Sequence, residues 1–255
     1  MYFFHAIIIA VVEGITEFLP VSSTGHMILT ADLLRIPYSD FLSTFTISIQ
    51  LGAILAVVFL YWKKLFAGLE IWKKIIIAFL PSAILGFTFY PFIKQMLVGN
   101  TVVLRSLFFG GIALIIFELW YKEKETDIAE VENISYKQSF IVGLYQCIAM
   151  IPGVSRSAAT IIGGLTQRMK RQVIVEFSFL LAIPTMGAAT GYDLLKNATA
   201  FSFDQFGLLS IGFIIAFLVA VLSIKFLLSL VKKYTFLGFG VYRIIIAIVF
   251  WLFIS

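Results

Sequence analysis

Two acidic residues and a run of hydroxyl-bearing side chains stand together near the start of the chain. Residues 13–26 read Glu-Gly-Ile-Thr-Glu-Phe-Leu-Pro-Val-Ser-Ser-Thr-Gly-His, inside an otherwise apolar segment. Glu13 and Glu17 are four positions apart, so a helix would project both carboxylates from one face. Pro20 breaks such a helix just before the hydroxyls. An ionisable group at membrane depth costs about 3 kcal/mol on insertion scales, so this cluster predicts a functional site.

A second polar break lies in the other half of the chain, where residues 151–157 read Ile-Pro-Gly-Val-Ser-Arg-Ser. Arg156 needs an anion in such apolar surroundings, and its guanidinium fork suits the geometry of phosphate. Gly153 permits close approach of the backbone, and a helix that begins near Ser155 would direct free N–H groups at the same anion. These features predict a phosphate pocket. A structural ion pair between Arg156 and one of the acidic residues is the alternative, and it is compatible with an empty pocket.

The two breaks together predict metal-assisted phosphoryl chemistry. Mg²⁺ is usually held by one or two carboxylates plus the phosphate oxygens of a substrate, so Glu13 and Glu17 are the predicted ligands, with Ca²⁺ as the chemical alternative. The metal and Arg156 would neutralise charge on the transferring phosphoryl group. Ser23 or His26 could be the nucleophile, or His26 could act as general acid or base while water attacks. The sequence does not choose between these mechanisms.

The composition is that of a polytopic membrane protein. Hydrophobic residues make up 61% of the chain and charged residues only 13%, and the mean hydropathy is +1.03. These values exclude an ordinary soluble domain. The net charge is +5, but the basic residues fall in short clusters between apolar runs, so we expect them to set topology and expect no nucleic-acid partner. Cys147 is the single cysteine and is expected to be a packing residue.

Six apolar runs have about the 20 residues that a membrane-spanning helix needs. They are Phe41–Trp62, Ile75–Phe92, Val102–Tyr121, Val173–Leu195, Phe206–Leu230 and Phe236–Ile254. The two broken segments lie outside these runs, and we expect each to enter the membrane and return as a re-entrant helical hairpin. The mixed-charge stretch Lys122–Lys137 is interpreted as a solvated connector between the halves.

The two halves of the chain form a weak internal repeat. Residues 18–24, Phe-Leu-Pro-Val-Ser-Ser-Thr, correspond to residues 151–157, and each copy precedes three spanning runs. Three spans per half is an odd number, so the second half must be inverted in the membrane, with the functional site at the repeat interface. We therefore expect an all-α inverted-topology repeat: a first repeat at residues 1–125, a cytoplasmic linker at 126–138 and a second repeat at 139–255.

The basic residues support one orientation of this arrangement. With the N-terminus outside, the inside loops would hold Lys63, Lys64, Lys73, Lys74, Lys122, Lys124, Lys137, Arg168, Lys170, Arg171, Lys232 and Lys233. The outside loops would hold only Arg35, Lys94, Arg105 and Lys196. This asymmetry predicts that both termini lie outside. The two broken tips would then meet near the membrane midplane and form one site.

These motifs resemble those of the bacterial undecaprenyl-diphosphate phosphatase family, also called UppP or BacA. Residues 13–26 resemble the acidic motif and the serine-histidine segment of that family, and residues 152–160 resemble its PGxSRSxxT motif. Residues 176–184 and the Tyr242-Arg243 pair are also similar. The resemblance extends over essentially the whole chain.

The resemblance implies an integral membrane enzyme that hydrolyses undecaprenyl diphosphate to undecaprenyl phosphate and inorganic phosphate. Such an enzyme recycles the lipid carrier for peptidoglycan synthesis and confers bacitracin resistance when abundant. It would depend on a divalent cation and lie in the bacterial cytoplasmic (inner) membrane with its site toward the outer face. The catalytic residues carried over are Glu17, Ser23, His26 and Arg156, and the metal ligands are Glu13 and Glu17. The implied substrate-binding residues are Ser22, Thr24, Ser155, Ser157 and Thr160.

A transporter or lipid flippase is the main alternative, because inverted repeats with broken helices are also a transporter architecture. A structural membrane protein is a third reading. Paired acids, hydroxyls, histidine and arginine together exceed what anion binding requires, and they favour the enzyme. Its polyprenyl diphosphate substrate has a chain that belongs in the lipid bilayer, so the pocket should open sideways between helices. The sequence leaves the oligomeric state open, and a homodimer is compatible with it.

Overall fold

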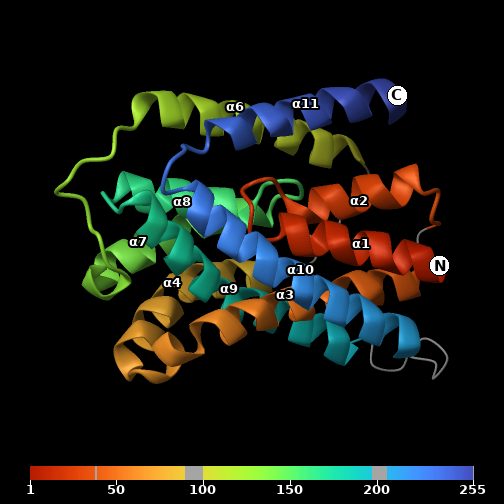
Figure 1. Cartoon of the computed structure of the whole chain (residues 1–255), viewed down its shortest axis with the longest axis horizontal. Coiled ribbons are helices and arrows are strands. Elements are labelled where there is room, and N and C mark those ends of the chain that lie inside the picture. Colours follow the sequence, from red (N-terminus) through yellow and green to blue (C-terminus); the bar gives the residue numbers. More distant parts are fainter. Residues whose placement is uncertain (38, 90–99, 197–205, 255) are drawn as a thin grey trace.

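The computed structural model describes residues 1–37, 39–89, 100–196 and 206–254, and its elements are helical (Figure 1). They are α1 (Phe3–Thr16), α2 (Ser23–Leu33), α3 (Asp40–Phe66), α4 (Leu69–Thr88), α6 (Asn100–Trp120), η1 (Val131–Asn133), α7 (Tyr136–Gln146), η2 (Cys147–Met150), α8 (Arg156–Thr166), α9 (Arg171–Lys196), α10 (Phe206–Leu230) and α11 (Leu237–Ile254). The extended pairing in these ranges is a single bridge between Ile128 and Met169. The predicted all-α fold is confirmed.

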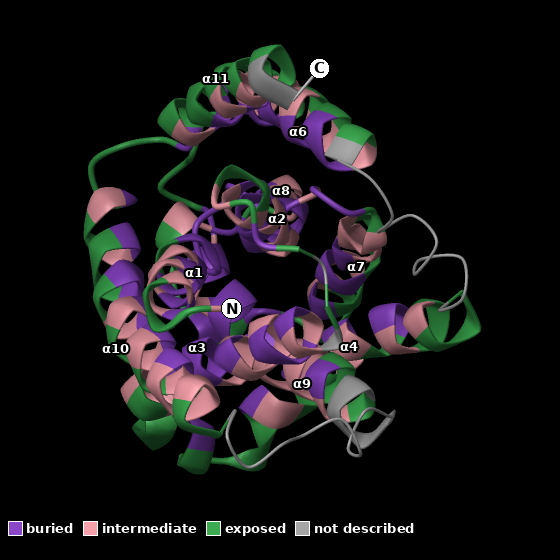
Figure 2. Ribbon diagram, turned by 90° about the vertical axis from the view of Figure 1, so that its right-hand side faces the viewer, coloured by how far each residue is buried: buried purple, intermediate pink, exposed green. Residues whose placement is uncertain are grey.

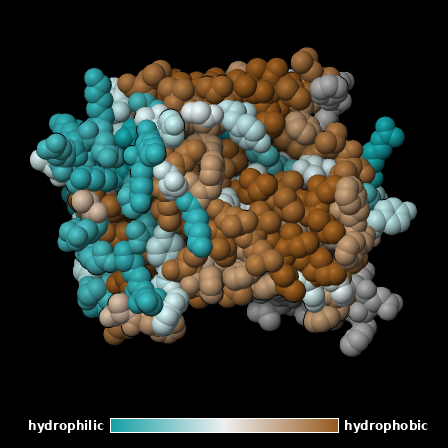
Figure 3. Space-filling view, viewed as in Figure 1, coloured by the Kyte–Doolittle hydropathy of each residue, from teal (hydrophilic) through white to brown (hydrophobic). Residues whose placement is uncertain are grey.

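Within the described residues, five helices are long and apolar enough to cross a membrane. The qualifying segments are Phe41–Phe66, Leu69–Thr88, Thr101–Trp120, Arg171–Tyr192 and Phe206–Leu230. The sixth predicted span corresponds to α11, whose apolar part is shorter. The surface agrees with a polytopic membrane protein, because a broad hydrophobic face ends at one strongly hydrophilic end (Figure 3). The end of the second predicted span, with Lys94, lies outside the described residues.

The lysine-rich loop predicted between the first two spans is shorter than expected. Helix α3 continues to Phe66 and α4 begins at Leu69, so only two residues separate them. Lys64 stays within α3 and forms an ion pair with Glu132 at 3.0 Å, and Lys74 lies buried in α4, where it donates to the Glu132 carbonyl at 2.5 Å. The stem of a lysine side chain is apolar, so a helix can continue through lysines at its end. The apolar run in the sequence therefore ends before the helix does.

The two polar breaks interrupt the helices as predicted. Helix α1 ends at Thr16, four residues before Pro20, and α2 begins at Ser23. In the second half α7 passes into η2, and α8 begins only at Arg156. Each break contains one residue in the left-handed region of backbone conformation: Ser22 with φ 74° and Gly153 with φ 86°. The chain can therefore reverse sharply at both tips.

The helices pack in reciprocal pairs across the two halves. Helix α1 packs on α10, and α7 packs on α4; α3 lies against both α9 and α10, and α6 lies along α11. In Figures 1 and 2 the α6–α11 pair lies on one side, with α2 and α8 between it and the other helices. Gly14 of α1 and Gly143 of α7 stand at close crossings: an added Cβ would lie 2.7 Å from Val219 and 2.2 Å from the Ala78 carbonyl oxygen. Small residues permit such close backbone approach in membrane helices.

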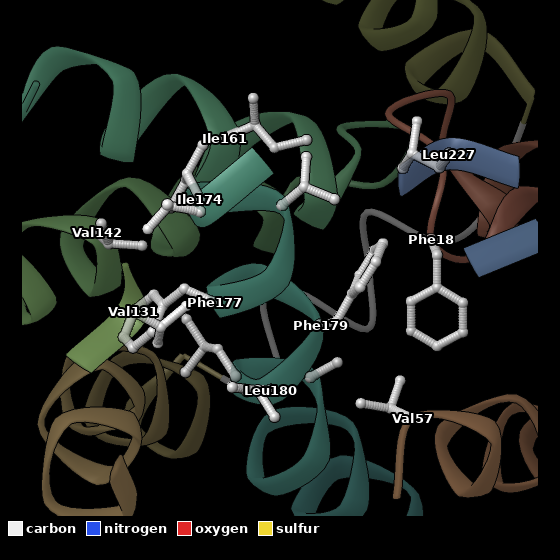
Figure 4. Packing of buried hydrophobic residues seen from close by; sticks show 14 of the residues in the cluster. Phe18, Val57, Val131, Val142, Ile161, Ile174, Phe177, Phe179, Leu180 and Leu227 are labelled. Carbon is white, nitrogen blue, oxygen red and sulfur yellow. The ribbon is translucent and has the colours of Figure 1, made fainter. Parts of the chain in front are cut away.

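The main apolar core includes part of the segment that was expected to be a solvated connector. Val131 and Ile134 are buried there, in the same cluster as Phe177 and Phe179 of α9 (Figure 4). Most residues of 122–137 are exposed, as expected of a solvated connector, but Val131 and Ile134 are buried in the core. The apolar residues of this segment are few and lie among charged ones. The sequence pattern therefore does not show which of them are buried, and only the tertiary contacts do. The core also reaches the first tip, where Phe18 packs edge-on against Phe179 with ring centroids 5.2 Å apart.

A polar network ties several segments together at the hydrophilic end. Arg171 at the start of α9 pairs with Glu118 of α6 at 2.7 Å, and Glu118 also accepts from the backbone N–H of Phe236 at 3.2 Å. The Tyr121 hydroxyl donates to Asp127 at 2.8 Å. Burial, with the Asp127 carboxylate, raises the pKa of Tyr121, so it stays a neutral donor. The network joins α6, the segment after it, α9 and the start of α11.

Candidate active site

The two acidic residues lie on one helical face at the end of α1. Glu17 follows the last residue of the helix with φ −60° and ψ −44°, and its N–H donates to the carbonyl of Glu13 at 2.9 Å. The helical turn thus continues through Glu17, as the four-residue spacing predicts. Both side chains are buried, Glu13 completely. The apolar helix positions two carboxylates away from bulk water.

Glu17 joins the two broken segments. It accepts a hydrogen bond from the Ser23 hydroxyl at 2.5 Å through Oε2, and from Arg156 Nη2 at 3.1 Å through Oε1. The second terminal nitrogen of Arg156 donates to the carbonyl of Ser178 in α9 at 3.0 Å. The structure therefore brings three of the predicted catalytic residues into direct contact, although Arg156 is 139 positions from Glu17.

His26 lies in the first turns of α2, next to this group, and has a partner on each ring nitrogen. Nδ1 lies 2.8 Å from the carbonyl oxygen of Ser22, and Nε2 lies 2.8 Å from the hydroxyl of Tyr242. A carbonyl only accepts, so Nδ1 carries the proton and neutral His26 presents Nε2 as an acceptor. The His26 and Tyr242 rings are stacked, with centroids 5.5 Å apart and planes 8° apart. Tyr242 entered the sequence interpretation only as a resembling residue, without a role.

Two of the predicted substrate-binding hydroxyls cap helices. Ser22 accepts from the backbone N–H of Gly25 at 3.4 Å, and Ser155 accepts from the N–H of Ala158 at 3.1 Å. Such caps satisfy N–H groups that have no partner within the helix. Thr24 is half-buried in the first turn of α2. The caps hold α2 and α8 so that both begin at the site.

The other two predicted hydroxyls tie the tips to each other and to α9. Ser157 donates to the carbonyl of Phe18 at 2.9 Å, a direct link between the second tip and the first. Thr160 donates to the Arg156 carbonyl at 3.0 Å and lies 2.7 Å from the Ser178 hydroxyl. Both side chains are fully buried. Their contact with a substrate stays a prediction, while their bonds to the backbone are observed.

Arg243 is a structural element of the site that the sequence interpretation named only as part of the similar Tyr242-Arg243 pair, without a role. It is buried in α11 and donates to the backbone carbonyls of Pro20 at 3.3 Å, Gly153 at 3.2 Å and Ser106 at 3.0 Å. One guanidinium thus fixes both tips to α6. Gly110 makes room for it, because a Cβ there would lie very close to the guanidinium. A lone arginine inside a predicted span must find internal partners, and that signal could have identified it.

Three buried polar atoms have no hydrogen-bond partner among the described residues: both carboxylate oxygens of Glu13 and Nε of Arg156. A buried unpaired carboxylate is costly, and a cation bound beside it would lower that cost. The described part of the chain contains no group of three or more histidine, cysteine or acidic side chains that could hold a metal ion without further ligands. Glu13, with the remaining lone pairs of Glu17, instead fits a divalent ion that shares its coordination with substrate phosphate.

Comparison with known proteins agrees with this arrangement. The family profile described as "Bacitracin resistance protein BacA" matches residues 6–249. The chain belongs to the BacA family. Among its curated relatives, a protein of Wolinella succinogenes named undecaprenyl-diphosphatase is 49% identical over 250 residues, covering 98% of this chain and 97% of the relative. Proteins with the same name from Aquifex aeolicus (50% identity, 96% of each chain) and Campylobacter jejuni (49% identity, 96% of this chain and 92% of the relative) are similar.

In this BacA-family chain, Ser23, Glu17 and Arg156 are arranged as a nucleophile, a base and a residue that orients the base. The Ser23 hydroxyl points at a carboxylate that can take its proton, and Arg156 orients that carboxylate from the other side. Nucleophile, base and orienting group in hydrogen-bond reach of one another are the general signature of covalent catalysis. His26 stands apart from this chain of contacts, with Nε2 turned to Tyr242.

Proposed function

We infer that the chain is an undecaprenyl-diphosphatase: it hydrolyses undecaprenyl diphosphate to undecaprenyl phosphate and inorganic phosphate. This reaction recycles the lipid carrier of cell-wall synthesis, and the family name associates it with bacitracin resistance. The observation that carries the conclusion is the contact of Ser23, Glu17 and Arg156 in one buried site of a BacA-family chain.

The site has the groups needed to bind a diphosphate. Arg156 Nε is unpaired in the described part of the chain and is available to a phosphate oxygen. Helix α8 begins at Arg156, so its first N–H groups and the positive end of its dipole face the same place. We propose that the terminal phosphate binds here, with the hydroxyl of Thr24 as a further donor.

The geometry favours Ser23 as the nucleophile. In the proposed first step Ser23 Oγ attacks the terminal phosphorus while Glu17 accepts the hydroxyl proton, the P–O–P bond breaks, and undecaprenyl phosphate leaves. In the second step water attacks the phosphoserine, the bond between phosphorus and Ser23 Oγ breaks, and Glu17 returns its proton to Ser23 Oγ as inorganic phosphate is released. The proton of this water passes to His26 Nε2 through the Tyr242 hydroxyl, because Nδ1 is committed to the Ser22 carbonyl and Tyr242 is the partner of Nε2. The alternatives are attack by His26, or direct attack by water with His26 as general acid or base and without a phosphoserine.

We propose that Glu13, with Glu17, holds a divalent cation, with Mg²⁺ as the better match for two carboxylates plus phosphate oxygens and Ca²⁺ as the alternative. A cation bound there supplies charge neutralisation for the phosphoryl group. The unpaired oxygens of Glu13 support this assignment.

We also propose that the halves at residues 1–125 and 139–255 are inverted repeats joined by the cytoplasmic linker 126–138. The reciprocal packing supports this, because exchanging the halves converts the α1–α10 contact into the α7–α4 contact. In the bacterial inner membrane, the loops at the hydrophilic end would then face the cytoplasm and the site would open toward the outer side. The lipid partner is the polyprenyl diphosphate itself.

The first experiment measures phosphate release from undecaprenyl diphosphate by the purified detergent-solubilised protein, with Mg²⁺ and then with chelator. We expect chelator-sensitive release that falls by at least about 10²-fold in Arg156→Ala, because a phosphate-binding donor is lost. Arg105→Ala is the matched control, since Arg105 is exposed on α6 and distant in sequence from both motifs. Folded protein without phosphate release, or wild-type turnover in Arg156→Ala, contradicts the proposed function.

A further inference from the structure

A cavity of about 720 Å³ lies beside the site, between the end of α1, the first tip, α10 and α11. Its walls are mostly apolar, and its volume falls within the range of about 300–1,000 Å³ that is typical of small-molecule pockets. Ile15 and Phe226 on its walls are 45% and 56% exposed, so the cavity opens on the lipid-facing surface of the helices. Figure 3 shows that this side of the molecule is broadly hydrophobic.

The inner wall of the cavity is also a wall of the active site. Tyr242 lines the cavity and at the same time contacts Nε2 of His26 at 2.8 Å. Leu19 and Val21 line it from the first tip, and Val21 is next to Ser22, whose carbonyl fixes the other nitrogen of His26. A ligand that fills the cavity therefore ends beside the histidine.

The residues that line the cavity extend away from the active site toward the start of α11. From Tyr242 the lining extends to Leu237 at the start of α11, to Leu230 at the end of α10 and to Tyr234 in the segment between the two helices. This is toward the Lys232–Lys233 turn and hence toward the predicted cytoplasmic side. A lipid whose head group sits at the outer side extends its chain inward, in this same direction.

We propose that this cavity binds the isoprene units nearest the diphosphate and so makes the enzyme select long polyprenyl chains. The inference rests on the proposed function for the identity of the head group. Its physical basis is the burial of apolar chain, worth about 0.8 kcal/mol for each methylene removed from water. A phosphate ester with a short chain would fill the phosphate pocket alone and gain nothing from the cavity.

The chain offers a matched pair of positions for the test. Gly238 lines the cavity, and a Cβ added there meets no atom within 4 Å, so a large side chain would enter open space. Gly207 is likewise exposed with open space around an added Cβ, but it lies outside the cavity lining. Each is the second residue of its helix, α11 and α10 respectively. Gly238→Trp fills the cavity, and Gly207→Trp controls for a tryptophan on a membrane helix.

The kinetic test compares kcat/KM over polyprenyl diphosphates from a single isoprene unit to undecaprenyl. For the wild type and for Gly207→Trp we expect kcat/KM to rise with chain length. Gly238→Trp should lower kcat/KM for the long chain by about tenfold, equivalent to about two excluded methylenes, and leave the single-unit substrate within about twofold. Equal loss on all substrates, or no loss on the long one, overturns the proposal while phosphatase activity itself still stands.

A binding test needs no turnover, so it separates this inference from the proposed function. Gly238→Cys and Gly207→Cys are each made in a Cys147→Ser background, and their alkylation by a maleimide is timed in detergent. Undecaprenyl phosphate should slow alkylation at position 238 about tenfold and leave position 207 unchanged, because a ligand that occupies most sites shields the thiol. Inorganic phosphate should protect neither position. Protection by an ordinary phospholipid equal to that by undecaprenyl phosphate would mean a general lipid groove and would overturn the proposal.

Discussion

At the scale of single residues, the site is defined by what Glu17 contacts. Its two oxygens have different partners, a hydroxyl from the first tip and a guanidinium from the second. Glu13, one turn earlier, has neither. Two acids that look equivalent in the sequence are therefore distinct in the structure. This difference fits the proposal that Glu17 accepts a proton and that Glu13, together with Glu17, holds a cation.

The role of Ser23 gives the sharpest prediction at this scale. Ser23→Ala should lower kcat by at least about 10³-fold, because it removes the attacking oxygen and leaves the phosphate pocket intact. Rapid quench of the wild type with terminally ³²P-labelled substrate should trap label on Ser23, identified by peptide mass spectrometry. Ser48→Ala is the control, since its hydroxyl only donates to a carbonyl of its own helix. Near-normal turnover in Ser23→Ala would assign the attack to water or to His26.

At the scale of helices, close crossings hold α1 and α7, which precede the two breaks, against the long helices α10 and α4. Gly14 and Gly143 allow α1 and α7 to approach α10 and α4, and side chains there would collide with the neighbouring helix. This close packing of α1 and α7 is compatible with the contact between the two tips, where Ser157 donates to the Phe18 carbonyl.

Gly143→Ala tests this packing. Its Cβ would overlap the Ala78 carbonyl, so α7 must shift, and we expect a loss of about 1–3 kcal/mol of stability, as for other overpacked sites. The measurement is thermal unfolding in detergent, followed by circular dichroism. Gly187→Ala is the matched control within α9, where an added Cβ meets no atom within 4 Å. An unchanged midpoint for Gly143→Ala would show that α7 does not depend on this contact.

At the scale of the whole molecule, charge and topology determine which side the site faces. The basic loops gather at one end, where buried contacts such as Arg171 with Glu118 join α9 to α6. Positive charge is retained on the cytoplasmic side of membrane proteins, so the opposite end should be external.

Cysteine labelling in whole cells tests this orientation. In a Cys147→Ser background, Pro37→Cys lies in an exposed loop before α3, and Glu125→Cys lies in the exposed segment after α6. A membrane-impermeant maleimide should label position 37 in intact cells and position 125 only after permeabilisation. The reverse pattern would invert the topology and place the site toward the cytoplasm.

Much of this arrangement could be predicted from the sequence because local physics determines it. The length of the apolar runs predicted the spanning helices. Prolines followed by hydroxyl-bearing residues predicted where both helices break. The four-residue spacing of Glu13 and Glu17 placed them on one face, and Arg156 required an anion wherever it lay. The helix ends were less predictable, since Lys64 and Lys74 belong to helices although they are charged.

Other features were decided only by tertiary structure. Whether Arg156 meets Glu17 or Glu13 depends on how two hairpins more than a hundred residues apart are docked, and no local rule specifies that. The same holds for Arg243, whose partners are backbone carbonyls that any residue could supply, and for Tyr242 beside His26. The sequence by itself determined which polar and charged groups need a hydrogen-bond or ionic partner away from water. The packed helices decided which partner satisfies each, because that choice depends on distances of a few ångströms between segments that the chain order does not bring together.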